Sequence, residues 1–202
     1  GLDAAIAAAG ALLGYCRHTQ QASLPHVTGL RVERESELVI MDAATRRNLE
    51  ITETLGGAES PTLFSLLDRC ATSMGSRRLR HWLHHPLRDT AVLRARQAAI
   101  SGLVHPGSRL RHPELRTLLS PWSDVERITA RVALRTARPR DLSGLRDTLT
   151  ALPALHAALA ASAQAGLEAL ARSLVPLDAV QAHLERTLKE EPAAVLREGG
   201  VI

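Results

Sequence analysis

The chain has 202 residues, of which 45% are hydrophobic and only 2% are aromatic. This hydrophobic content is ample for a buried core and argues against an intrinsically disordered chain. The few aromatic residues argue against an all-β fold and against a surface that stacks single-stranded bases, while the formal net charge of +4 allows an anionic partner.

The first predicted element is a helix rich in Ala and Leu over residues 2–17, which ends before a break at Pro25. Apolar residues on both sides of the polar stretch 33–37 are typical of a short β-hairpin near residues 30–41. Asp42 is a good N-cap for a helix over 43–53, because its carboxylate can accept a bond from the first turn. Thr62 caps a further short helix.

Two longer helices are predicted next. The first begins at Ser73 and is stopped by Pro86, and the second covers residues 90–104 with Asp89 as its cap. Trp82 follows Leu79 at helical spacing, so we expect Trp82 to lie in the core between these two helices.

The remaining segments also favour helices. A short helix is expected around 115–119, and another runs from Asp124 to about Thr136. Asp124 and Glu126 stand at the start of this second helix, where carboxylates suit the helix dipole, so we expect a capping role there. Pro139 suits the first turn of a long, Leu-striped helix in which Pro153 should cause a kink. Leucines at helical spacing near 167–174 and 180–188 predict two final helices. The expected fold is therefore mainly α, with about nine helices and one small β-hairpin.

A basic middle region is the clearest charge feature of the sequence. Between Arg77 and Arg140, fourteen arginines stand against four acidic residues, a balance of +10, so the rest of the chain carries −6. Four arginines at spacings of four, four and three are expected to form one stripe on a helix; these are Arg127, Arg131, Arg135 and Arg138. Such a stripe is a candidate for weak contact with a polyanion or a partner, and it can equally pair with acidic helices of the same molecule.

Catalytic and metal-binding patterns are weak. Lys189, the only lysine, is followed by Glu190 with no glycine-rich turn upstream, so there is no nucleotide-binding P-loop. His81 and His85 are four residues apart, a spacing that can place two imidazoles on one metal, but the sequence offers no obvious third ligand. We therefore assign no catalytic, cofactor or metal residue.

Several motifs, in order, resemble the MutS family of DNA mismatch-repair proteins. They are Asp42-Ala43-Ala44-Thr45-Arg46-Arg47-Asn48-Leu49-Glu50-Ile51, Thr62-Leu63, Leu66-Leu67-Asp68, Met74-Gly75-Ser76-Arg77, Leu79, Trp82-Leu83, Pro86-Leu87, Arg96-Gln97, Asp124, Glu126-Arg127, Arg138-Pro139-Arg140-Asp141-Leu142 and Leu196-Arg197-Glu198-Gly199-Gly200-Val201-Ile202. The resemblance covers nearly the whole chain.

The resemblance implies a piece of a longer protein. Residues 1–28 would be the last helix of a connector domain with its linker, and residues 29–202 the first part of the core, or lever, domain, ending just before the clamp insertion. The family reads the mismatch with a Phe-x-Glu motif, whereas Phe64 here is followed by Ser65 and Leu66. ATP and magnesium would bind only elsewhere in the full-length protein, so the fragment would have neither active site nor cofactor.

The role implied by the family is mechanical: helices would couple the ATPase state to the DNA clamp. The implied partners of the full-length protein are mismatched duplex DNA, a second subunit and downstream repair proteins. No apolar run approaches the ~18 to 20 residues of a membrane span, and we expect a bacterial cytoplasmic protein that is nucleoid-associated on DNA.

The alternative is a stand-alone helical module that binds nucleic acid or protein through its Arg-rich middle. A helical metalloenzyme using His81 and His85 is a third interpretation.

Overall fold

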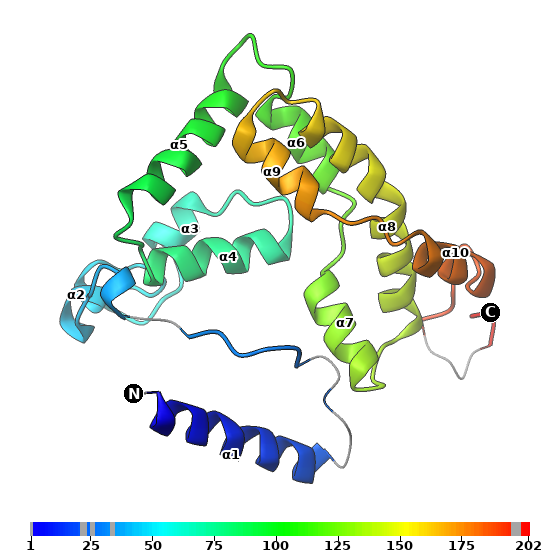
Figure 1. Cartoon of the computed structure of the whole chain (residues 1–202), viewed down its shortest axis with the longest axis horizontal. Coiled ribbons are helices and arrows are strands. Elements are labelled where there is room, and N and C mark those ends of the chain that lie inside the picture. Colours follow the sequence, from blue (N-terminus) through cyan, green and yellow to red (C-terminus); the bar gives the residue numbers. More distant parts are fainter. Residues whose placement is uncertain (1, 21–23, 25–26, 33–34, 195–198) are drawn as a thin grey trace.

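The computed structural model describes residues 2–20, 24, 27–32, 35–194 and 199–202, and in these residues the fold is mainly helical, as predicted. Figure 1 shows α8 and α9 side by side in the upper part of the molecule and α1 along its lower edge. The described residues form ten α-helices: α1 (Asp3–Gln20), α2 (Ala43–Asn48), α3 (Leu63–Leu67), α4 (Ser73–His84), α5 (Thr90–Val104), α6 (His112–Leu119), α7 (Val125–Ala133), α8 (Pro139–Ala160), α9 (Ala165–Ser173) and α10 (Asp178–Thr187).

Helix starts follow the short polar residues that precede them. Asp42 accepts a hydrogen bond from the Thr45 backbone N–H at 2.6 Å and so caps α2. Thr62 caps α3, and Asp89 caps α5 by accepting from two backbone N–H groups of its first turn. These caps satisfy N–H groups that the helix itself leaves without partners, which confirms the three predicted starts.

The predicted β-hairpin near residues 30–41 is wrong. Residues 33–34 lie outside the described part of the chain, but no described residue of 30–41 belongs to a strand. Glu35–Glu37 form a 3-10 turn, and Leu38 makes an isolated antiparallel bridge with Leu87. The extended backbone after this turn therefore pairs with residues near Pro86, where the Val39 N–H donates to the Pro86 carbonyl at 2.8 Å.

Two helices are shorter than predicted. α2 ends at Asn48 rather than near Glu53, and Glu50 just beyond it has a φ of 45°, which a continuing helix does not allow. α7 ends at Ala133 rather than near Thr136, and Arg135 has a φ of 56°. Left-handed backbone therefore ends both segments at non-glycine residues that sequence patterns do not mark as stops.

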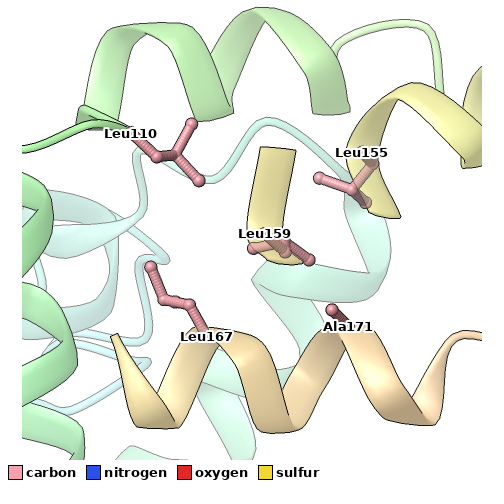
Figure 2. Packing of buried hydrophobic residues seen from close by; sticks show 5 residues of the cluster. All are labelled: Leu110, Leu155, Leu159, Leu167 and Ala171. Atoms are coloured by element: carbon pink, nitrogen blue, oxygen red, sulfur yellow. The ribbon is translucent and has the colours of Figure 1, made fainter. Parts of the chain in front are cut away.

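The first buried cluster joins two helices, α8 and α9, and the loop before α6. Figure 2 shows its five side chains, which point toward one another. They are Leu110, Leu155, Leu159, Leu167 and Ala171. α8 supplies Leu155 and Leu159 four residues apart, which places both on one face of the helix. This face packs against α9, and each buried Leu contributes about 1.5 to 3 kcal/mol of transfer free energy.

A second cluster lies nearer the start of α8 and includes α10 and the end of the chain. Its buried members are Leu149, Leu152, Leu184, Leu188 and Val201. Trp122 and Leu174, both half-buried, pack against each of the two clusters. The two clusters therefore share these side chains as a common wall.

α8 is the central element of this half of the molecule, because α6, α7, α9 and α10 all contact it. The helix is continuous for 22 residues although Pro153 lies inside it. Proline has no backbone N–H, so the Leu149 carbonyl receives no helical hydrogen bond from position 153. α5 contacts α9, and α3 contacts α4, so the earlier helices pack beside this centre. None of the described helices has the length and hydropathy needed to cross a membrane.

Candidate functional site

The four arginines of the predicted stripe do not share one helix. Arg127 and Arg131 lie on α7, Arg135 follows its end, and Arg138 is the N-cap residue of α8 with extended backbone (φ −95°, ψ 159°). The reason is local: a residue before proline is disfavoured in helical backbone, and Pro139 begins the next helix. The prediction of a single helical stripe is wrong.

Two of these arginines have carboxylate partners. Arg131 donates to Asp141 at 2.5 Å, and Arg127 lies 3.6 Å from Asp124. Asp141, in the first turn of α8, also accepts a hydrogen bond from the backbone N–H of the N-cap residue Arg138 at 2.9 Å, which stabilises the start of the helix. Within the described residues, the Arg135 and Arg138 side chains are exposed and make no ion pair. Contact with a polyanion or a partner stays a prediction for the four arginines.

The strongest polar cluster joins α4 to the start of α7. Arg77 donates to both carboxylate oxygens of Asp124, at 2.5 and 2.8 Å, and to Glu126 at 2.5 Å. Ser73, one turn earlier on α4, donates to Asp124 at 3.1 Å. A guanidinium that grips a carboxylate through two nitrogens fixes orientation as well as distance. The cluster therefore sets the position of α7 relative to α4.

Asp124 also caps α7 by accepting from the Arg127 backbone N–H at 3.2 Å, which confirms the capping role predicted for this carboxylate. The Arg77 hydrogen bonds, with smaller contributions from the Arg127 N–H and the Ser73 hydroxyl, hold the pKa of Asp124 far below its ordinary value. Hydrogen bonds to Asp124 and Glu126 likewise raise the pKa of Arg77. Both groups are charged at neutral pH, so the cluster binds and orients rather than exchanging protons.

Trp82 does not lie in the core, contrary to the sequence prediction. Its side chain is 38% exposed, and two guanidinium groups lie over its ring, that of Arg96 at 3.9 Å and that of Arg78 at 5.7 Å from the ring centroid. Helical periodicity predicts a core position for Trp82, but it does not show that guanidinium groups from α4 and α5 lie over its ring. An indole ring attracts cations through its electron-rich face.

The two histidines that suggested a metal site lie together on α4 and its C-cap. The His81 and His85 rings stack with centroids 4.5 Å apart. Across the described part of the chain, no group of three or more His, Cys, Asp or Glu side chains is placed to hold a metal ion. Cys70 is exposed as a whole residue, but partial desolvation of its sulfur, together with the neighbouring Asp68 carboxylate, raises the pKa of its thiol, which is the opposite of what a nucleophile needs.

The family model described as MutS domain III matches residues 44–202. The chain belongs to this family. As a MutS domain III chain, it uses its buried leucines and its Arg77 cluster to hold helices in place, and the match covers every helix from α3 to α10.

Sequence patterns do not predict the cluster of Arg77 with Asp124 and Glu126 in this MutS domain III chain. Sequence patterns predict Asp124 and Glu126 as the acidic start of a helix, but Arg77 lies 47 positions before Asp124 and stands among Arg78 and Arg80. Periodicity offers one usable signal, because Ser73 and Arg77 are four residues apart and must share a helix face. That spacing alone does not identify the carboxylate that binds to this face.

Proposed function

We propose that this chain is a structural lever segment of a mismatch-repair ATPase of the MutS family, and that it couples the state of a distant ATPase to a DNA clamp. The observation that carries the proposal, beyond the family match, is the central position of α8. This helix contacts α6, α7, α9 and α10, so a displacement of α8 has to move or repack all four.

Side-chain packing supports this mechanical role. The buried clusters lie along successive parts of α8, and Trp122 and Leu174 pack against both. Close-packed interiors deform little, so such a row of packed groups transmits force better than a chain of exposed contacts. The Arg77–Asp124 pair adds a directional link from α4 to α7.

The wider assignments belong to the same proposal. Residues 1–28 would complete a connector domain and residues 29–202 begin the lever. ATP and magnesium would bind elsewhere in the full-length protein, which would act on mismatched duplex DNA with a second subunit and downstream repair proteins in the cytoplasm. No catalytic step is assigned to the residues of this chain.

A coupling experiment tests the lever in a full-length protein that contains this segment. Leu155→Ala would loosen the packing of α8 while leaving distant nucleotide and DNA sites intact. We expect near-normal affinity for a mismatched duplex and for ATP, but a reduced ability of ATP to change the protein's dissociation rate from DNA. Fluorescence anisotropy with a labelled duplex measures this rate, and Leu170→Ala, at an exposed site on α9, is the control.

Unchanged coupling in the Leu155→Ala protein, at a temperature where it is folded, would contradict the lever. The isolated chain tests the alternative of a stand-alone binding module. Tight, salt-dependent binding to a duplex, lost when Arg135 and Arg138 are both replaced by Ala, would favour the module, because released counterions give phosphate contacts a steep salt dependence.

A further inference from the structure

A small hollow of about 90 Å³ lies where α4 meets the segment that precedes α2. Its walls include Arg78 and Trp82 of α4, Arg96 of α5, and Leu38 and Leu87. The backbone bridge between Leu38 and Leu87 fixes two of these walls, and the Arg88 N–H donates to the Glu37 carbonyl at 2.9 Å beside it. The hollow is therefore built by non-local contacts rather than by one flexible loop.

The charge of this hollow is positive. Three guanidinium groups, those of Arg31, Arg78 and Arg96, line it with one carboxylate, that of Glu37. Among the carboxylates that the structure describes, none is within ion-pair distance of Arg78 or Arg96, whereas Arg77 on the same helix is fully paired. The two guanidinium groups lie against Trp82 instead.

Stacking on Trp82 prepares these arginines for an anionic ligand. A guanidinium that lies over an aromatic ring keeps its N–H groups in its own plane, where they can still reach a carboxylate through two hydrogen bonds. The ring also limits the conformations of both side chains before a ligand arrives, which lowers the entropic cost of binding.

The lining favours a protein carboxylate over a nucleic acid. The Arg96 guanidinium is 3.9 Å from the Trp82 centroid, so it occupies a position that a stacked base would need. Leu38 and Leu87 supply apolar walls, which suit the methylene groups of a glutamate or a neighbouring aliphatic side chain. A phosphodiester backbone gains nothing from such apolar walls.

We propose that the Trp82 hollow is a docking site for an acidic segment of a partner protein, in which glutamates alternate with aliphatic residues. One carboxylate binds between Arg78 and Arg96, and an adjacent aliphatic side chain lies against Leu38 and Leu87. This site goes beyond the lever role, because it needs neither nucleotide nor mismatched DNA, and its failure would leave the lever untouched.

Calorimetry with the whole chain tests the site, using a short synthetic peptide of glutamates with interspersed leucines. The comparison peptide has every glutamate replaced by glutamine. We expect the Glu peptide to bind more weakly as salt rises, and Arg96→Ala or Arg78→Ala to weaken it by at least about tenfold, which corresponds to 1.4 kcal/mol. Arg96→Lys, which keeps the charge but loses the planar fork, should give an intermediate affinity.

Arg94→Ala is the matched control, because Arg94 is an exposed arginine of α5 that does not line the hollow. It should change the affinity by less than about twofold. In a Trp122→Phe background Trp82 is the sole tryptophan, so its fluorescence should respond to the Glu peptide directly. Equal binding of the Gln peptide, equal losses in the Arg94 and Arg96 variants, or a duplex DNA that binds through Arg78 and Arg96 more tightly than the Glu peptide would each overturn the proposal.

Discussion

Arg77 of α4 holds Asp124, the N-cap residue of α7, through both terminal nitrogens of its guanidinium group. One carboxylate thus has two tasks. It caps α7 by accepting a hydrogen bond from a backbone N–H of its first turn, and it anchors α7 to α4 through Arg77, which lies 47 positions before it in the chain. Disturbing Asp124 should consequently affect both the start of α7 and its placement.

Replacing Asp124 by alanine is expected to destabilise the protein. The loss of the cap alone typically costs about 1 kcal/mol, and the loss of the bidentate partner of Arg77 adds to it. Urea unfolding followed by circular dichroism measures the change. Arg127→Ala is the control, since Arg127 is exposed and lies 3.6 Å from the same carboxylate, and it should change stability by less than about 0.5 kcal/mol. Equal losses of unfolding free energy in the two variants would contradict the role of Asp124 as cap and as partner of Arg77.

The same carboxylate predicts a pH dependence. Its pKa is lowered in the folded state, chiefly by the Arg77 hydrogen bonds, so its contribution to stability is fully present above the ordinary Asp pKa of about 3.9. The contribution is lost as the pH falls below that value, because the unfolded chain then takes up a proton more readily. The melting temperature of the Asp124→Asn protein should therefore fall less than that of the native protein between pH 6 and pH 3. Parallel pH profiles for the two proteins would be inconsistent with this linkage.

Features fixed within one helical turn could be predicted from the sequence. Asp42, Thr62, Asp89 and Asp124 each cap a helix as expected, since the bond that they accept comes from two or three residues away. Features that depend on distant contacts were missed. Leu38 pairs with the distant Leu87 instead of forming a hairpin. The arginine stripe fails for a local reason that helical periodicity does not show, namely left-handed backbone at Arg135.

Two leucines of α9 give a matched test of the core. Leu167 is 4% exposed and belongs to the first cluster, whereas Leu170 is 55% exposed. Leu167→Ala should lower the free energy of unfolding by about 2 to 5 kcal/mol, because it removes transfer energy and leaves a cavity. Leu170→Ala should change it by no more than about 0.5 kcal/mol. Similar losses in chemical denaturation would show that α9 buries a different face.

Two helical glycines should respond oppositely to alanine. A Cβ at Gly144 of α8 would lie 2.5 Å from the Ser123 Oγ and 3.1 Å from the Ser123 Cβ, so the loop before α7 must shift. A Cβ at Gly10 of α1 would meet nothing within 4 Å. Gly144→Ala should lower the melting temperature, although alanine gains about 1 kcal/mol of helix propensity. Gly10→Ala should raise the helical signal in circular dichroism, and a loss of signal there would contradict the open surroundings.

The two tryptophans should report different environments. Trp82 is 38% exposed, while Trp122 packs against both clusters. In single-tryptophan variants, Trp82 should emit at longer wavelength than Trp122, and Trp82→Ala should cost less stability than Trp122→Ala. A blue-shifted Trp82 emission would restore the core position that helical periodicity suggested.

Trp122 and Leu174 also determine how the protein should open in hydrogen exchange. Because the two clusters share few side chains beyond these two among the described residues, one cluster can lose its order while the other keeps it. Pro153 lies at this boundary in α8 and contributes no amide. Amides on its two sides should therefore exchange with solvent deuterium at two separate rates, so that a single continuous helix would belong to two units of local unfolding.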